Sequence, residues 1–205
     1  MYENLLIIFI KNNVNGNVKT RLARDLGPWI AQRIYHKLVK ATLVAAAPLK
    51  ADIRLSFSEN LDDYSYYRGE KISREIQSGI DLGEKMLTSF SCAFSEGYRH
   101  ICLIGTDCYG INPGILNHAF ETLQNKDFAI GPSNDGGYYL IGMNFLFKDA
   151  FLNKSWGTGS VLEETLTGIR DAGFSYGLVR EMVDIDTKSD LDLMNIDLKN
   201  FVDDD

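Results

Sequence analysis

The sequence predicts an α/β protein in which helices cover both faces of a mostly parallel sheet. Short apolar runs alternate along the 205 residues with segments whose apolar side chains recur at helical spacing. Three of the apolar runs end abruptly in polar residues, which is typical of strands that lead into ligand-binding loops. No repeat, low-complexity tract or linker interrupts the alternation, so we expect a single domain over residues 1–205.

The segments expected to be strands are rich in isoleucine, valine, leucine and aromatic residues. One of them contains the dipeptide Asp-Gly, a strong turn signal, and is expected to form an antiparallel hairpin ending in GGYYLIGM. The expected strands are residues 4–10, 52–58, 100–108, both halves of 127–143, and 178–185.

The expected helices are marked by residues that start or stop them. Pro28 fits a first helical turn and Pro48 ends that helix, while Gly97 stops a helix that begins near residue 82. Three further starts have N-cap signals, and residues 59–81 between two of these elements read as irregular. The three starts are Asn112 before Pro113, Ser160 with Glu163 at capping-box spacing, and Thr187 with Asp190.

The composition is that of an ordinary globular protein, with 45% hydrophobic and 24% charged residues. The run LLIIFI is too short to span a bilayer and lacks the features of a signal peptide, so we expect no membrane span and a cytoplasmic protein. Three cysteines, Cys92, Cys102 and Cys108, have neither disulfide-framework nor zinc-site spacing, and we expect buried free thiols. The sequence does not indicate an oligomeric state.

One segment is cationic in an otherwise acidic chain. Residues 11–24 hold Lys11, Lys19, Arg21 and Arg24 and no acid, a local charge of +4, so a net charge of −7 leaves −11 for the rest. This segregation favours a small anionic ligand such as a phosphate group and argues against nucleic acid as a partner. A solvated basic turn is the alternative.

The cationic segment is not a known phosphate-loop motif. Its spacing departs from both Walker A and G-x-G-x-x-G, so neither a P-loop nucleotidase nor a dinucleotide dehydrogenase is supported. Gly16 would still let the backbone approach a ligand, and backbone N–H groups of the turn could form an anion nest. Lys19 and Arg21 could then neutralise a diphosphate.

Acidic residues follow two of the other expected strands. Asp107 could either cap its loop or hold Mg²⁺ or Mn²⁺, because hard cations bind carboxylate and phosphate oxygens. Asp184 and Asp186 alternate, so their side chains are expected on opposite faces and only one can face a shared metal. Asp186 could instead be the N-cap of the helix at Thr187.

The segment NDGGYYL, residues 134–140, also has two interpretations. It is a hairpin turn by its Asp-Gly dipeptide, but Gly136 and Gly137 could also form a bare backbone floor beneath a substrate. Asp135 would then be free to bind hydroxyl groups. Trp156 and Thr158 precede a helix and could supply a stacking face and an anion-accepting helix start, or they could belong to the core.

Six segments together resemble a bacterial glycosyltransferase-A-like family, the rSAM/selenodomain-associated transferases. This family is related to the molybdenum cofactor guanylyltransferases and to the guanylyltransferase of the lactyl-phosphate cofactor pathway. The segments occur in the family's order and cover most of the chain: IIFIKNNVNGNVKTRLARDLG, QSGIDLGEKM, LIGTDC, IGPSNDGGYYLIGM, WGTGSVLEETL and DIDTKSDL.

The resemblance implies a GT-A fold, a Rossmann-like domain of nucleotide-diphospho-sugar transferases, and roles for individual residues. Nucleotide phosphates would be bound by Lys11, Gly16, Lys19 and Arg21. Asp107 would bind Mg²⁺ or Mn²⁺ with Asp186 as second ligand and Asp184 as a weaker candidate, and Asp107 and Asp135 would be catalytic. The substrate or acceptor side would be formed by Gln77, Gly136, Gly137, Tyr138, Trp156 and Thr158.

Three functions follow from these observations. The leading one is metal-dependent transfer of a sugar from a nucleotide-diphosphate-sugar to a small acceptor that the sequence does not identify. The second is nucleotidyl transfer from a nucleoside triphosphate with release of pyrophosphate; the fuller glycine-rich loop of sugar-phosphate nucleotidyltransferases is absent. The third is a nucleotide-binding protein without catalysis, because Asn13, Asn15 and Tyr109 stand where relatives have prolines. We expect the asparagines to loosen the first loop.

Overall fold

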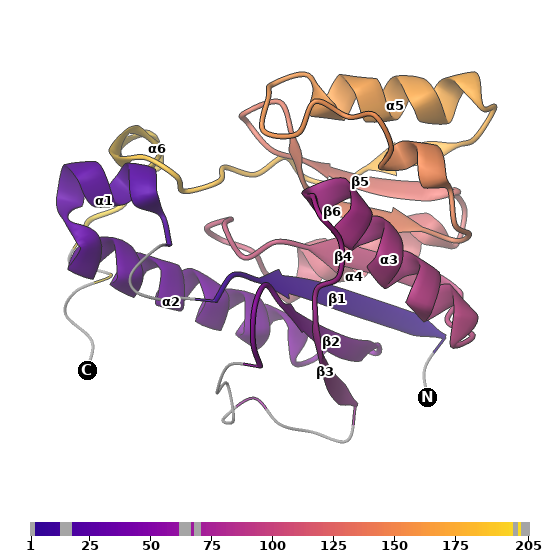
Figure 1. Ribbon diagram of the computed structural model, residues 1–205, viewed down its shortest axis with the longest axis horizontal. Helices are drawn as coiled ribbons and strands as arrows, with labels where there is room; N and C mark the ends of the chain where they lie inside the picture. Colours follow the sequence, from indigo (N-terminus) through magenta and orange to yellow (C-terminus); the bar gives the residue numbers. More distant parts are fainter. Residues whose placement is uncertain (1–2, 13–17, 62–66, 68–70, 199–200, 202–205) are drawn as a thin grey trace.

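The computed structural model describes residues 3–12, 18–61, 67, 71–198 and 201 (Figure 1). Within this part, seven strands form one sheet in the order β3-β2-β1-β4-β6-β5-β7, and β6 alone is antiparallel to its neighbours. The mostly parallel sheet with one antiparallel hairpin is the predicted architecture. The strands are β1 (Asn4–Ile10), β2 (Asp52–Phe57), β3 (Ile72–Ile76), β4 (His100–Ile104), β5 (Phe128–Pro132), β6 (Tyr138–Met143) and β7 (Tyr176–Leu178).

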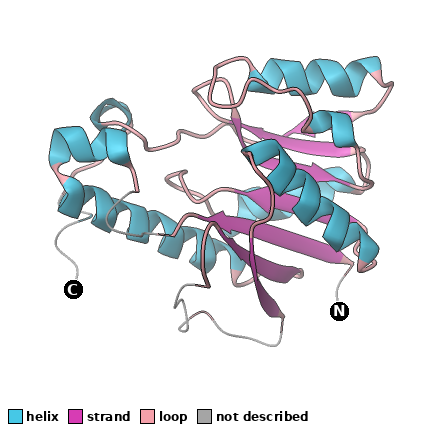
Figure 2. Cartoon of the chain, in the orientation of Figure 1, coloured by secondary structure: helices cyan, strands magenta, loops and turns pink. Residues whose placement is uncertain are grey.

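Helices cover both faces of this sheet (Figure 2). On one face, Leu5 and Ile7 of β1 share a core with Phe90 of α3 and Ile169 of α5; on the other, Leu6 packs with residues of α2 and α4. This alternation follows from the period of two in a strand. The helices are α1 (Thr20–Leu26), α2 (Pro28–Ala46), α3 (Leu82–Ser95), α4 (Pro113–Leu123), α5 (Val161–Asp171), α6 (Lys188–Leu193) and the short 3₁₀ helix η1 (Lys148–Ala150).

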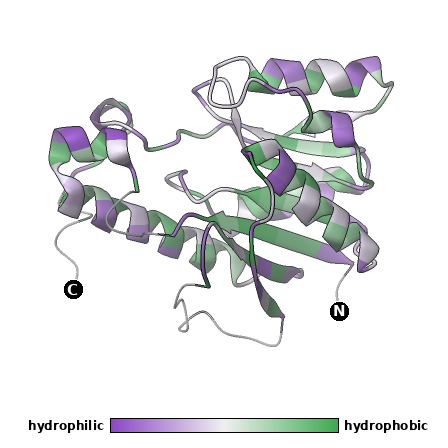
Figure 3. Ribbon diagram, viewed as in Figure 1, coloured by the Kyte–Doolittle hydropathy of each residue, from purple (hydrophilic) through white to green (hydrophobic). Residues whose placement is uncertain are grey.

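The interior strand β1 is strongly apolar, as its colour in Figure 3 shows. It lies between two parallel neighbours, β2 and β4, and most of its side chains are fully buried. Because both faces are covered, an unbroken apolar run is favoured over an alternating one. Because β1 and β4 are parallel neighbours, their carboxyl ends lie at the same edge of the sheet.

Several predicted boundaries are confirmed. Pro28 begins α2, and Asn112 caps α4 with a bond from the Ile115 N–H to Asn112 Oδ1 at 3.1 Å. Gly97, at φ 95°, follows the end of α3. Thr187 caps α6 in a capping box with Asp190.

Other predictions are wrong. Helix α1 lies in a segment to which no helix was assigned, and strand β3 lies in a segment expected to be irregular. The last strand is β7, not 178–185; beyond it the structure has isolated bridges at Met182 and Asp184. Ser160 bonds Glu164 Oε1 at 2.6 Å rather than forming a capping box with Glu163, and Cys92 is exposed, unlike the other two thiols.

No helix in the described ranges has the length and apolar character needed to cross a membrane.

Candidate functional site

A pocket of about 600 Å³ opens at the carboxyl edge of the sheet, beyond β1 and β4. This volume is in the range of small-molecule sites. Gly136 is not among the described residues that line it, and Gly16 lies outside the described residues, as do Asn13 and Asn15 of the loop expected to be loose. The other predicted site residues all line it: Lys11, Lys19, Arg21, Gln77, Asp107, Asp135, Gly137, Tyr138, Trp156, Thr158, Asp184 and Asp186.

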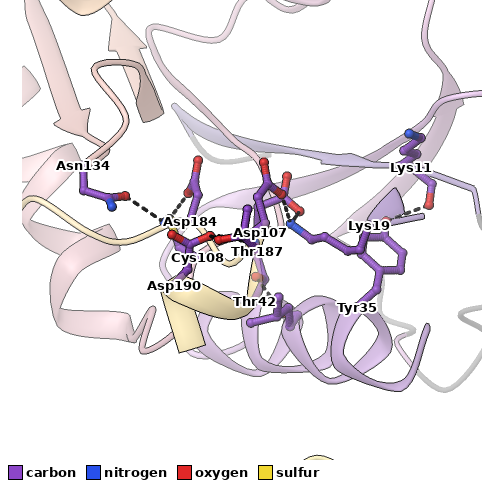
Figure 4. A network of polar contacts seen from close by, with 12 residues as sticks. Lys11, Lys19, Tyr35, Thr42, Asp107, Cys108, Asn134, Asp184, Thr187 and Asp190 are labelled. Atoms are coloured by element: carbon purple, nitrogen blue, oxygen red, sulfur yellow. Dashed lines mark hydrogen bonds and ion pairs between the residues drawn. The ribbon is translucent and has the colours of Figure 1, made fainter. Parts of the chain in front are cut away.

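Lys19 is held between two of the predicted metal ligands (Figure 4). Its Nζ donates to Asp186 Oδ1 at 2.7 Å and forms an ion pair with Asp107 Oδ1, while the Lys19 side chain is only 4% exposed. Burial alone would lower the pKa of Lys19, but the carboxylates of Asp107 and Asp186 outweigh burial and raise it. Lys19 is therefore a fixed cation in the pocket.

Asp186 reaches this position because it does not cap a helix. The N-cap of α6 is Thr187, whose backbone N–H donates to Asp190 Oδ2 at 2.7 Å, so the alternative interpretation of Asp186 as the cap is wrong. Asp184 accepts a bond from Cys108 Sγ at 2.8 Å. The two alternating acids thus make different contacts, and Asp186 is the one that shares a cation with Asp107.

The loop that carries the cations is anchored at both described ends. Before it, the buried side chain of Asn12 accepts from the Glu59 N–H at 2.8 Å and donates to the Asn60 carbonyl at 2.9 Å. After it, Lys19 adopts a left-handed conformation at φ 51° directly before α1. Lys11 and Arg21 line the same pocket, and neither forms an ion pair with another described residue.

Asp184 has an altered acidity. Burial raises its pKa to about 6; the Cys108 bond opposes this, and the charges of Asp107 and Asp135 add to it. Burial and the carboxylate of Asp184 likewise raise the pKa of the Cys108 thiol, which therefore remains protonated. Asp184 and Cys108 together form a neutral or singly charged pair beneath the pocket.

We expect Asp184→Asn to stabilise the protein above pH 6. An unfolded chain loses this proton near pH 3.9 and the folded state near pH 6, so stability falls as pH rises from about 4 to about 6. Asparagine removes this loss, so its stabilising effect should grow from about zero at pH 4 to about 2 kcal/mol at pH 7. Urea denaturation at both pH values measures it. The exposed Asp171→Asn is the control, and an equal gain at pH 4 would contradict the prediction.

The turn between β5 and β6 explains the contacts of Asp135. Its Oδ1 accepts from Ser133 Oγ at 2.5 Å and from the Gly137 N–H at 3.0 Å, which closes the turn. The second carboxylate oxygen makes no hydrogen bond with a described residue. The turn interpretation of Asp135 is therefore confirmed for one oxygen, while a substrate-binding role of the other oxygen stays a prediction.

Gly136 is needed for packing rather than as a pocket floor. It has φ 84°, and a Cβ there would lie 2.2 Å from the carbonyl oxygen of Gly159. Its own carbonyl accepts from the Leu162 N–H at 3.0 Å. The backbone of the Gly136 turn thus packs against the backbone at Gly159, and this contact fixes the loop that precedes α5.

Gly136→Ala should lower the free energy of unfolding by about 3 kcal/mol, because a positive φ and a backbone clash both oppose alanine. Thermal unfolding followed by circular dichroism measures the loss. Gly173→Ala is the matched control, since it has φ 79° but nothing within 4 Å of a Cβ, and it should cost only about 1 kcal/mol. Equal losses in the two variants would show that the Gly159 contact has no energetic weight.

The pocket also has an apolar side, of which the sequence predicted only Tyr138 and Trp156 as site residues. The rings of Tyr138 and Trp156 meet edge to face with centroids 6.4 Å apart. Trp156 also packs on the first turn of α3, where a Cβ on Gly83 would lie 2.8 Å from Trp156 Nε1. The lining residues that the sequence analysis did not single out include Phe9, Leu82, Lys85, Met86, Leu103 and Ile141. Three of them, Leu82, Lys85 and Met86, lie in the QSGIDLGEKM segment.

The acidic residues fit a hard cation in part. Oxygens of Asp107 and Asp186 converge on one point, where Lys19 Nζ lies. No cluster of three or more histidine, cysteine, aspartate or glutamate side chains suited to a metal occurs among the described residues. Asp107 and Asp186 would thus hold Mg²⁺ or Mn²⁺ only together with ligand oxygens, which is the usual manner for Mg²⁺.

The fold and the strand-end site define a class, the GT-A-like proteins. The chain resembles the crystal structure of a "putative nucleotide-diphospho-sugar transferase" from Desulfovibrio desulfuricans G20 with a TM-score of 0.87 and 32% identity, covering 95% of this chain and 87% of that one. It belongs to the family described as "Uncharacterized protein conserved in bacteria (DUF2064)", whose model matches residues 39–158.

More distant structures share the fold alone. The inositol-1-phosphate CTP transferase from T. maritima has a TM-score of 0.56 at 17% identity, covering 98% of this chain and 96% of that one. A nucleotidyl transferase from Methanothermobacter thermautotroptrophicus has a TM-score of 0.60 at 16% identity, with 98% of both chains covered. Among curated proteins, no sequence match was found.

Proposed function

We propose that the protein is a metal-dependent glycosyltransferase that moves a sugar from a nucleotide-diphosphate-sugar to a small acceptor. The observation that carries the proposal is the convergence of Asp107 and Asp186 on the buried Lys19 at the edge of a GT-A-like sheet. The relative from Desulfovibrio desulfuricans, described as a "putative nucleotide-diphospho-sugar transferase", supports the sugar donor. The six sequence segments further support membership of the rSAM/selenodomain-associated group.

The charges of the pocket explain why a metal ion is part of the proposal. The cations Lys11, Lys19, Arg21 and Lys85 are matched by four carboxylates, those of Asp107, Asp135, Asp184 and Asp186. A pocket with no net positive charge binds a diphosphate poorly unless a further cation enters with it. A divalent ion held by Asp107 and Asp186 would supply that charge and stabilise the leaving nucleoside diphosphate.

The chain's own residues would divide the remaining work. Lys11 and Arg21, which have no ion-pair partner among the described residues, would bind the phosphate oxygens at the mouth of the pocket. Lys19 would face the same oxygens from its fixed position, so that no reorganisation is needed as charge develops. Asp135 would take the proton of the acceptor hydroxyl on its second oxygen.

Binding and product analysis test this proposal. Nucleoside diphosphates and nucleotide sugars are screened by thermal shift with and without Mn²⁺, and a metal-dependent rise in Tm is expected because ligands stabilise the state they bind. Arg21→Gln should reduce the rise and the exposed Lys40→Gln should not. Release of a nucleoside diphosphate during turnover would support sugar transfer, whereas the absence of a shift with any nucleotide would contradict the proposal.

Nucleotidyl transfer is the second candidate. The structures described as an inositol-1-phosphate CTP transferase and a nucleotidyl transferase share the fold over nearly the whole of both chains. The same cations and carboxylates would serve a nucleoside triphosphate. Release of pyrophosphate in the presence of a phosphorylated acceptor would favour this candidate over the first.

A further inference from the structure

Lys85 is a pocket cation that forms no ion pair with a described residue, as is also true of Lys11 and Arg21. Lys85, in the second turn of α3, is half-buried and lines the pocket, and its side chain makes no hydrogen bond or ion pair with a described residue. Lys19, in contrast, contacts two carboxylates. A partly desolvated ammonium group without a partner is costly, so its position favours an anionic ligand.

The acids nearest to Lys85 in the sequence are engaged elsewhere. Asp81 caps α3, accepting on Oδ1 from the Glu84 N–H at 2.8 Å. Glu84 reaches back and accepts on Oε2 from the Ile80 N–H at 3.0 Å. Together they form a reciprocal cap of the helix start. The cap fixes the first turn of α3, and neither Asp81 nor Glu84 forms an ion pair with Lys85, which lines the pocket.

Apolar residues close to Lys85 on α3 line the same pocket. Leu82 and Met86 of the same helix line the pocket together with Trp156 and Tyr138. This wall is closely packed, because a Cβ on Gly83 would lie 2.5 Å from the Phe151 carbonyl oxygen and 2.8 Å from the Trp156 ring nitrogen. It is therefore preformed in the structure, as small-molecule sites commonly are.

Apolar side chains also continue from the pocket to the surface. Leu82 is 46% exposed and Ile80, two residues earlier, is 89% exposed. Exposed apolar residues beside a pocket mark a binding surface more often than isolated ones do. A ligand on this side would therefore contact apolar side chains both within and at the mouth of the pocket.

Lys19, which serves the proposed nucleotide, comes from a different part of the fold. It directly precedes α1, and α1 and α2 pack with the C-terminal segment on the face of the sheet opposite α3. Figure 1 shows α1 and α3 on separate sides of the carboxyl edge. Lys85 comes from α3, so Lys19 and Lys85 reach the pocket from different elements of the fold.

We propose that Lys85, Leu82, Met86 and Trp156 form the acceptor subsite, and that the acceptor is an amphiphilic anion. Its carboxylate or phosphate would pair with Lys85, and its apolar body would lie against the indole ring and the aliphatic side chains. The assignment of this subsite to the acceptor rests on the proposed function. Binding at the subsite itself can be tested without any nucleotide.

Two fluorescent probes that differ in charge provide the test. Anilinonaphthalene sulfonate carries an apolar body and one anionic group, and phenylnaphthylamine is its uncharged analogue. Lys85→Gln should weaken binding of the sulfonate roughly five- to tenfold and change binding of the neutral probe less than about twofold. Trp156→Leu should weaken both. Lys40→Gln, an exposed lysine of α2, should change neither.

The result that overturns the subsite is equal binding of the sulfonate to wild type and Lys85→Gln, or the same loss in Lys40→Gln. A nucleoside diphosphate with Mn²⁺ that displaces the sulfonate competitively would assign the subsite to the nucleotide and overturn the acceptor assignment. Failure of all nucleotides to bind would refute the proposed function. The comparison of the sulfonate with the uncharged probe would still decide whether Lys85 binds an anion.

Discussion

Asp107→Asn should lower transferase turnover about 1000-fold. The substitution keeps the shape of the side chain but removes one of the two charges that converge on Lys19. Loss of a preorganised electrostatic contact costs about 100- to 1000-fold in turnover, and weaker metal binding adds to that loss. The measurement is the initial rate of nucleoside diphosphate release as a function of Mn²⁺ concentration.

Asp107→Asn should not weaken the residual nucleotide binding that wild type has without metal, because Lys11 and Arg21 remain in the pocket. The Mn²⁺-dependent part of the thermal shift should disappear. Asp171→Asn, an exposed acid at the end of α5, is the control and should behave as wild type. Metal-dependent turnover at the wild-type level in Asp107→Asn would mean that this carboxylate is not a metal ligand.

Lys19→Met should lower turnover by about two to three orders of magnitude and also destabilise the fold. The Lys19 side chain is only 4% exposed, and methionine preserves its buried aliphatic part but removes the cation. Asp107 and Asp186 are then left facing each other with no charge between them. Breaking a buried pair can cost several kcal/mol, but both carboxylates are nearly half exposed, so we expect about 1 kcal/mol at pH 7.

A double-mutant cycle separates repulsion from lost packing. Asp186→Asn should destabilise the wild type, because it removes the negative charge that pairs with Lys19 Nζ at 2.7 Å. In the Lys19→Met background the same change should stabilise, because it removes one of two like charges. Chemical denaturation at low salt measures both effects, and added salt should shrink them. An effect of the same sign in both backgrounds would contradict the charge pairing.

The elements predicted from the sequence are those with strong local signals. The apolar run of β1, the prolines that open α2 and α4, and the capping box at Thr187 each act on the residues next to them in the chain. The elements missed lack such signals. Helix α1 has seven residues, a left-handed residue before it and no acid in its first turn. Strand β3 is a half-buried edge strand with charged residues in its centre.

Only part of the candidate site could likewise be predicted from the sequence. Strand ends in a parallel sheet meet at one edge, so the sequence could place Lys19, Asp107 and Asp186 near one another. It could not show that the lysine lies between the two acids. Nor could it show that Asn12 is buried by bonds to residues 58–60, or that Arg54 is buried against Glu96 at the far end of α3.

By itself, then, the sequence determined the fold class, the edge of the sheet where the candidate site lies and the types of charge gathered there. These follow from periodicity, caps and composition, which act over a few residues. The tertiary structure decided which charges pair: Lys19 with Asp107 and Asp186, Asp184 with Cys108, and Lys85 with no described residue. Such pairs join residues far apart in the chain, up to 167 positions for Lys19 and Asp186. Only the order of strands and the packing of helices on both faces bring those residues into contact.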